Sequence, residues 1–442
     1  MELQICHVGD QNGAPLFSVV RSGDLKRTAP VSLPSPVSFP VGDDAERGLL
    51  PRLRWYLEGY LQAPFGAYRQ SAQAVAETLQ AWGGAVFDRL FVGEAQNWYQ
   101  TARRQSFRDF RIKITSDSPE IMAWPWEALY SREDGYLALR FPVERQLSTD
   151  LGDPPPLPES LPQDALRILY VIPRPDGTGN VGYRTLAKSL VGCIEEENLP
   201  VTVDVLRPPT FDRLRQVLGE RPGYYHIVHF DGHGSYGDSA PGAGCYAAAE
   251  GRLAFENEEG QLEAIETTRL AQLLAQYRIP CMVLNACQSG MMDGQARDPF
   301  ACVAAGLLRA GVYSVVAMGY SLYVSAAKEF VPAFYRKLFE KGSVSEAVRA
   351  GREEMYRQPQ RSCVTGKLPL QDWVVPVLYR QMPESDARFP SLQPDCQGKE
   401  GGPALPQEAD LGDYGFIGRD WELQQLERAM QRQPQAALLI HG

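Results

Sequence analysis

The stretch HIVHF, residues 226–230, runs directly into DGHG, residues 231–234. A short apolar run of this kind is typical of a buried strand in a parallel sheet. Its glycines would allow a sharp turn at the carboxyl end of the strand. That end is the edge where open α/β sheets carry their catalytic and binding groups. The stretch therefore predicts an α/β fold with His233 at the rim of the sheet.

A second stretch repeats the pattern. CMVLNAC, residues 281–287, is an apolar strand followed by a turn, with Cys287 at its tip and 54 positions after His233. That separation is enough for one βαβ crossover, so the two tips are expected on neighbouring parallel strands. A thiolate can then attack a carbonyl while the histidine acts as base and later protonates the leaving amine. The pair predicts a cysteine peptidase.

Each residue also has a structural interpretation, because a cysteine after an apolar strand is often a buried thiol and a histidine before glycine can be structural. Their joint occurrence at this spacing favours the catalytic interpretation. His226 and His229 are interpreted as structural or supporting residues. A metal site made by the three histidines is disfavoured, since 226 and 229 face opposite sides of a strand. No metal is therefore expected.

Elsewhere, residues 166–380 alternate strands and helices, which predicts a mostly parallel sheet flanked by helices. The expected strands are 166–173, 201–208, 226–230, 281–287 and 314–318, and the expected helices are 183–197, 210–218, 268–278, 301–309 and 329–339. In the N-terminal region, residues 50–91 predict helices, residues 110–114 a strand, and residues 119–130 a helix or tight turn with Trp124 and Trp126 in the core.

Two segments rich in proline divide the chain, and their composition predicts linkers. The resulting division is an N-terminal accessory α+β domain at 1–150, a linker at 151–165, a catalytic domain at 166–380, a linker at 381–412 and a further segment at 413–442. Within the catalytic domain, the stretch 235–260 is rich in glycine, alanine and acid and suits a mobile active-site loop.

Composition excludes several classes. The chain has 442 residues, a net charge of −10 and 44% hydrophobic residues, as expected of a globular protein. It has no basic run of the kind that binds nucleic acid and no apolar run near the ~20 residues that span a membrane. The N-terminus lacks a secretory pattern, so a cytoplasmic location is expected. The eight cysteines are scattered and form no CxxC pair, which argues against a disulfide framework and a zinc ribbon.

The blocks HFDGHG (229–234) and LNACQSG (284–290) resemble the CHAT family of caspase-like peptidases, relatives of separases and caspases. The other matching pieces are LRWYLEGYL (53–61), SPEIMAWPWEALY (118–130), AGVYSVVAMGYSLY (310–323), FVPAFYRKLF (330–339) and DWVVPVLY (372–379). The resemblance implies a caspase-like fold, His233 as general acid/base and Cys287 as nucleophile. It also implies that the backbone amides of Gly234 and Cys287 form the oxyanion hole.

The substrate cleft is less clearly indicated. Many family members carry a tryptophan after the strand at 314–318, whereas this chain has Met-Gly-Tyr-Ser at 318–321, which makes Tyr320 a candidate substrate-binding residue. Relatives that cut after arginine or lysine use an acidic residue, and Asp231, Asp293 and Asp298 are the nearest acids. Asp298 could instead cap a helix, and Asp231 could brace the turn beside His233.

The C-terminal stretch GFIGRDWELQQLERAMQ (415–431), followed by AALLIHG (436–442), resembles the lead-in to a STAND-type NTPase. Gly442 would be the first glycine of the phosphate loop GxxxxGK[ST]. The resemblance implies a protease held and released by a C-terminal NTPase sensor, with homo-oligomerisation on activation. ATP and Mg would serve the NTPase part alone, and the protease would need no cofactor. The substrate would be a specific protein, in a bacterial defence or programmed-death system.

Two other functions are compatible with parts of the sequence. The first is a catalytically inactive CHAT-like scaffold that acts as a protein-interaction module. The second, a phosphate-binding α/β signalling domain, is disfavoured because Pro-Arg-Pro at 173–175 follows the strand 168–172, where a glycine-rich phosphate loop would be needed.

Overall fold

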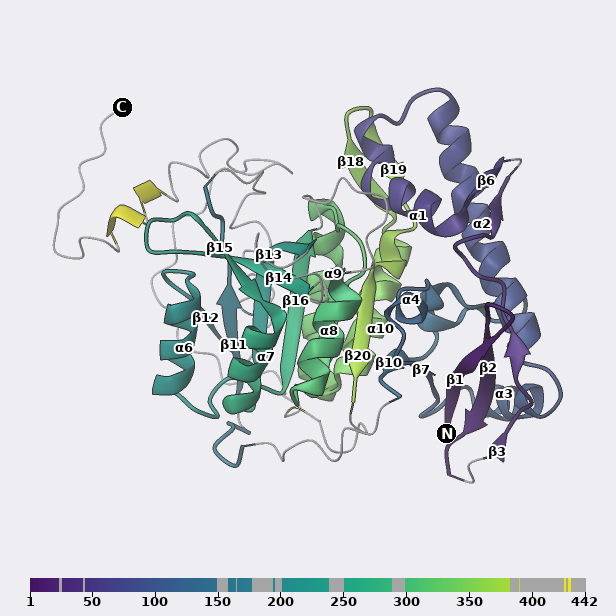
Figure 1. The fold of residues 1–442 in the computed structure, drawn as a ribbon, viewed down its shortest axis with the longest axis horizontal. Helices are drawn as coiled ribbons and strands as arrows, with labels where there is room; N and C mark the ends of the chain where they lie inside the picture. The colour runs from purple at the N-terminus through teal and green to yellow at the C-terminus, as the bar shows by residue number, and fades with distance from the viewer. Residues whose placement is uncertain are drawn as a thin grey trace.

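The computed structural model describes residues 1–23, 26–42, 44–148, 158–163, 165–176, 194, 201–237, 250–287, 299–381, 389, 425–426 and 428–430. For residues 44–47, 235–237, 250, 286–287 and 299–302 the description covers the backbone. Within these ranges, one central sheet extends from the N-terminal region into residues 166–380 (Figure 1).

The central sheet confirms the predicted α/β class. Its strands lie in the order β12 (Val201–Val205), β11 (Leu166–Val171), β13 (Ile227–Gly237), β16 (Cys281–Cys287), β17 (Ser314–Met318), β20 (Pro376–Arg380), β10 (Val143–Gln146), β7 (Arg111–Thr115), β1 (Glu2–Gln11), β2 (Ala14–Arg21) and β3 (Lys26–Arg27). Pairing is parallel from β12 to β17 and again from β20 to β1. The β17–β20 and β1–β2 pairs are antiparallel.

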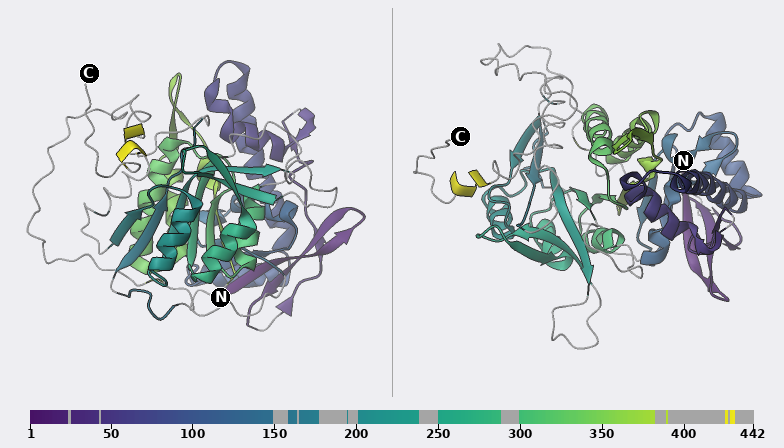
Figure 2. Two further views of the ribbon diagram at one scale, coloured as in Figure 1. Left: turned by 60° about the vertical axis from the view of Figure 1, so that its left-hand side comes forward. Right: turned by 90° about the horizontal axis from the view of Figure 1, so that it is seen from above.

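Helices cover both faces of the part of the sheet that runs from β12 to β20 (Figures 1 and 2). One face packs on α6 (Phe211–Glu220), α7 (Thr267–Gln276) and α8 (Pro299–Arg309), and the other on α9 (Val324–Lys341) and α10 (Val344–Arg357). The strand sequences explain this arrangement, because both sets of alternating side chains are mostly apolar. Val228 and Phe230 join the first core, while Ile227 joins the second. Parallel strands covered on both faces need such continuous apolar runs.

The N-terminal region contributes α1 (Leu49–Glu58), α2 (Ala67–Leu90), α3 (Glu94–Arg104) and α4 (Pro119–Met122). The predicted core role of Trp124 and Trp126 is confirmed: they are 3% and 0% exposed, and their ring centroids lie 6.2 and 6.4 Å from that of Trp82. The neighbouring Gly83 brings α2 against the chain, since a Cβ there would lie 1.8 Å from the carbonyl oxygen of Ala128.

The remaining described elements are short. They are β4 (Val31–Ser32), β5 (Pro40–Val41), β6 (Asp44–Gly48), β8 (Tyr130–Ser131), β9 (Gly135–Tyr136), β14 (Glu250–Glu256), β15 (Leu262–Glu266), β18 (Gln360–Cys363), β19 (Gly366–Pro369), and the 3₁₀ turns Tyr60–Gln62, Trp126–Ala128, Leu137–Leu139 and Asp372–Val374. None of the helices in the described ranges has the length and apolar character that a membrane crossing requires.

Two local predictions differ from the structure. The sharp turn expected at Gly232–Gly234 is wrong, because β13 continues to Gly237 and pairs with β14 in antiparallel register. Glycines are compatible with an extended strand as well as with a turn, and here the partner strand decides the conformation. For the same reason, part of the expected loop 235–260 is the hairpin of β14 and β15. The expected helix at 183–197 falls outside the described residues, apart from the single position 194.

Candidate active site

The two residues selected from the sequence are direct neighbours across two strands. Strands β13 and β16 pair in parallel over seven positions, from Ile227 opposite Cys281 to His233 opposite Cys287. Neighbouring strands lie roughly 4.8 Å apart in a sheet. His233 and Cys287 therefore stand side by side at the carboxyl edge of the sheet, where β16 ends.

A buried carboxylate joins these strands two positions before the pair. Asp231 is 6% exposed, and its Oδ1 accepts a hydrogen bond of 3.0 Å from Nδ2 of Asn285, the residue opposite it in β16. Its Oδ2 lies 2.9 Å from Nη2 of Arg174, which follows β11. Burial raises the pKa of Asp231 above its ordinary value, against the opposing effect of Arg174. The carboxylate of Asp231 thus connects the carboxyl ends of β11, β13 and β16.

The environment of His233 favours its neutral form. The side chain is half-buried, and burial lowers its pKa, with a further lowering by the charge of Arg174 and an opposing effect from Asp231. A neutral imidazole can accept a proton, which is the first task of a general base.

His226 is held as part of the structure. It is fully buried, its Nδ1 accepts a hydrogen bond of 3.0 Å from the backbone N–H of Arg167, and its Nε2 donates to the carbonyl of Pro162 at 2.9 Å. Both ring nitrogens are therefore occupied by backbone groups. This geometry agrees with a structural role.

His229 lies deeper, on the face of the sheet covered by α9. It is fully buried, its Nδ1 is 2.8 Å from the hydroxyl of Tyr335, and its ring centroid is 4.3 Å from that of Tyr170. Among the described residues, no group of histidine, cysteine, aspartate and glutamate is arranged to hold a metal ion.

The two buried histidines predict a pH dependence of stability. Burial lowers the pKa of His226 to about 4 and that of His229 to about 3. The unfolded chain protonates both from about pH 6.5 downward, so it gains protons that the folded protein does not accept. Their stabilising contribution is complete above about pH 6.5 and decreases as the pH falls. By about pH 4 we expect a loss of about 3 kcal/mol for each histidine.

Urea denaturation at a series of pH values measures this loss. The variant His229→Asn keeps a polar group near the position of Nδ1 and cannot titrate. Its stability should therefore fall less steeply with decreasing pH than that of the wild type. Equal slopes for the two proteins would contradict the prediction.

The loop after β17 is tied to the N-terminal region. The backbone N–H of Gly319 donates to the carbonyl of Val375 at 2.9 Å, and that of Ser321 donates to Oε1 of Glu58, on α1, at 2.9 Å. Tyr320 lies between them, half-buried against the core. Helix α1 thus fixes the loop that carries the candidate substrate-binding residue.

Of the remaining residues selected from the sequence, Gly234 lies within the described part of the chain and three lie outside it. The backbone of Gly234 lies opposite Leu253 in β14, immediately after His233. Asp293 and Asp298 lie outside the described residues, as do Gly442 and most of the segment 413–442. Arg174, Asn285 and Glu58 make contacts at this site that no sequence motif predicts. Asn285 could have been found from its place in the LNAC block, two positions before Cys287. Arg174 and Glu58 reach the site through contacts between residues far apart in the sequence.

Two solved structures are similar to the chain at low sequence identity. Among solved structures, the chain is similar to the Arg specific cysteine proteinase gingipain R (RgpB) of Porphyromonas gingivalis, with 13% identity over 77% of this chain and 76% of that chain and a TM-score of 0.40. It is also similar to separase in the Saccharomyces cerevisiae separase–securin complex, with 12% identity over 86% of this chain and 30% of that chain and a TM-score of 0.46.

No curated protein matches the chain. The family model for the CHAT domain matches residues 73–381, which is more than half of the sequence and includes β13, β16 and their partner strands. The chain therefore belongs to the CHAT domain family.

Proposed function

We propose that the protein is a cysteine endopeptidase in which Cys287 is the nucleophile and His233 the general acid/base. The observation that carries the proposal is the register of β13 and β16, which pairs these residues at the carboxyl edge of the sheet. Membership in the CHAT domain family supports a protease-type function.

In the proposed reaction, the thiol of Cys287 loses its proton to His233 and the thiolate attacks the peptide carbonyl carbon. A C–S bond forms, the C–N bond breaks, and the protonated His233 gives its proton to the leaving amine. Water, deprotonated by His233, then hydrolyses the thioester and restores the thiol. Backbone amides of Gly234 and Cys287 would stabilise the oxyanion.

Asp231 fits a positioning role better than a substrate-binding role in this scheme. Its two carboxyl oxygens are already engaged by Arg174 and Asn285, and the group is buried. Tyr320 and Asp298 remain candidates for the substrate cleft.

The wider setting is also a proposal. The protein would act in the cytoplasm on a specific protein substrate, as an effector in a bacterial defence or programmed-death system. The proposed organisation is an accessory domain at 1–150, the protease at 166–380 and the start of an NTPase at 413–442, with linkers between them. The NTPase, supplied with ATP and Mg, would control the protease, and activation would involve self-association.

A cleavage-site screen tests the chemistry. Proteome-derived peptides are treated with the wild type, with Cys287→Ala and with the control Cys363→Ala, and new termini are counted. We expect cuts from the wild type and the control, and loss of at least about 99% of them in Cys287→Ala. Cuts that persist in Cys287→Ala would contradict the mechanism.

Thiol labelling gives a second readout that needs no substrate. Cys281 is an internal reference, because burial raises its pKa to about 12 and leaves it unreactive at neutral pH. We expect iodoacetamide to label Cys287 faster than Cys281 and the partly exposed Cys363. Labelling of Cys287 at or below the rate of Cys363 would favour the inactive scaffold instead.

A further inference from the structure

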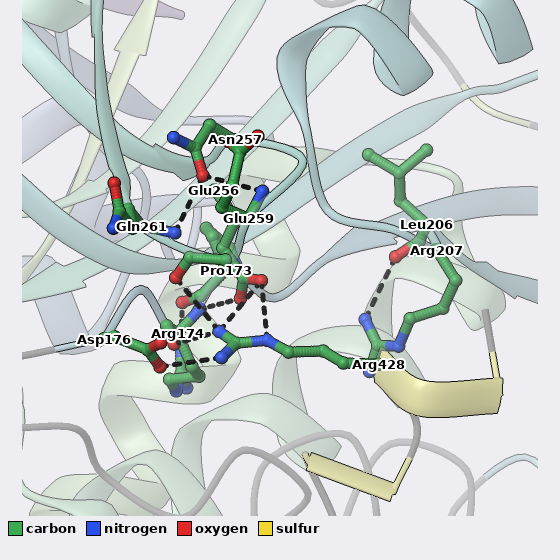
Figure 3. Close-up of polar contacts among 11 residues, drawn as sticks. Pro173, Arg174, Asp176, Leu206, Arg207, Glu256, Asn257, Glu259, Gln261 and Arg428 are labelled. Carbon is green, nitrogen blue, oxygen red and sulfur yellow. Dashed lines mark hydrogen bonds and ion pairs between the residues drawn. The ribbon is translucent and has the colours of Figure 1, made fainter. Parts of the chain in front are cut away.

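Of the described residues in the C-terminal segment, Arg428 inserts its side chain between β14 and the chain that follows β11. Arg428 is 9% exposed, and its guanidinium is surrounded by acceptors from the segment after β11 and from the β14–β15 hairpin (Figure 3). Nη1 lies 2.6 Å from Oδ1 of Asp176, and Nη2 lies 3.0 Å from Oε2 of Glu256. Nη2 also donates to the carbonyls of Arg174 at 3.0 Å and Gly260 at 3.3 Å. We call these four groups the acceptor socket.

The acceptor socket is shaped for a guanidinium. Gly260 has a φ of +83°, and a Cβ at this position would come within 2.7 Å of Cζ of Arg428. Two carboxylates and two carbonyls supply acceptors to the planar fork of Arg428, which a lysine ammonium could engage less completely. Met430, two residues further along, is 56% exposed, so the burial of Arg428 is not shared by this described neighbour.

The acceptor socket connects with the active site through one carboxylate. Glu256 is 3% exposed; its Oε2 contacts Arg428, while its Oε1 accepts a hydrogen bond of 2.7 Å from the backbone N–H of Arg174. The side chain of Arg174 turns the other way and pairs with Asp231. Asp231 lies two positions before His233 in β13 and holds Asn285 of β16.

We propose that Arg428 is a positioning residue for the active site, acting through Glu256, Arg174 and Asp231 on His233. The proposal rests on the proposed function for its catalytic meaning, although the contacts themselves do not depend on it. When Arg428 occupies the acceptor socket, its positive charge balances that of Glu256, which also accepts the hydrogen bond from the backbone N–H of Arg174. The guanidinium of Arg174 then keeps its ion pair with Asp231. The segment around Arg428 thereby keeps Arg174 and Asp231 in position beside His233 without contacting His233 itself through any of these bonds.

Removal of Arg428 would change this balance of charges. Glu256 and Asp176 would lose their shared cation, and the guanidinium of Arg174, whose backbone N–H already donates to Glu256, would be attracted toward them. Movement of Arg174 toward Glu256 would weaken its lowering effect on the pKa of His233, while the raising effect of Asp231 would stay. Among the described residues, Arg174 and Asp231 are charged groups that shift the pKa of His233, and they act in opposite directions. The loss of Arg428 should therefore make His233 easier to protonate.

The test uses the full 442-residue chain with the variants Arg428→Ala, Arg428→Lys and Glu256→Gln. Arg215→Ala is the charge-matched control, because within the described part of the chain Arg215 forms its ion pair with exposed Asp212 on α6. NMR of ¹³C-labelled histidine gives the pKa of His233, and hydrogen exchange reports on residues 173–176 and 425–430. We expect the pKa of His233 to rise by about half a unit or more in Arg428→Ala, less in Arg428→Lys, and not in Arg215→Ala.

On any substrate that the screen identifies, kcat should fall about tenfold in Arg428→Ala, with a smaller change in KM. Faster exchange in both segments together with the shift of His233 supports the proposal, even if the wild type proves to have no peptidase activity, which would count against the proposed function alone. Faster exchange with an unchanged pKa of His233 would show that Arg428 only holds its own segment in place, and would overturn its positioning role. Unchanged exchange would show that the acceptor socket does not hold Arg428, and would overturn the proposal entirely.

Discussion

Replacing His233 by alanine is expected to lower kcat for peptide hydrolysis by roughly 100- to 10,000-fold, with little change in the thermal unfolding midpoint. The large effect on rate follows from the proposed double role of His233, which must take a proton from Cys287 and return it to the leaving amine. The small effect on stability follows from its half-buried position at the edge of the sheet. Peptide hydrolysis and scanning calorimetry measure the two quantities.

The same strand provides the comparison that makes this test specific. His229 lies four positions earlier on β13, fully buried against Tyr335 and Tyr170. His229→Asn should therefore show the opposite pattern, with a lower unfolding midpoint and a kcat within about threefold of the wild type. If His229→Asn lost as much activity as His233→Ala while both remained folded, the assignment of His233 as the acid/base would fail.

The sequence was sufficient to identify the strands that carry the pair. Apolar runs such as residues 281–284 are long enough and bounded clearly enough to mark buried parallel strands. Because the carboxyl ends of parallel neighbours share an edge, the spacing of His233 and Cys287 also predicted their proximity, and the register of β13 and β16 confirms it.

The contacts around the pair could not be predicted in the same way. Arg174 and Glu256 are 82 positions apart, and Arg428 is 172 positions from Glu256. No local pattern links such residues, because their association depends on the complete sheet. The turn expected at Gly232–Gly234 failed for a related reason: glycine permits both a turn and a strand, and pairing with β14 selects the strand.

The N-terminal region joins the part of the sheet from β12 to β20 at one junction, between β10 and β20. Strands β10 and β20 pair there through a single pair of residues, Arg145 and Tyr379. Glu127 lies at this junction, 1% exposed, with one carboxyl oxygen 2.6 Å from Nη2 of Arg145 and the other 3.2 Å from Nη2 of Arg352 on α10. Burial lowers the pKa of Arg352 to about 10, with Glu127 opposing that effect.

Glu127→Gln should therefore reduce the free energy of unfolding by about 3–5 kcal/mol, because it keeps the shape of the side chain but leaves two buried guanidinium groups without their shared carboxylate. Glu353→Gln is the matched control: Glu353 pairs with Arg349 and Arg357 near the surface of α10, and its loss should cost at most about 1 kcal/mol. Urea denaturation followed by tryptophan fluorescence measures both. Since the buried cluster reinforces a junction with so little strand pairing, the wild type should unfold its two regions in one transition. Separate transitions in the wild type, or equal effects of the two substitutions, would show that Glu127 does not hold the junction together.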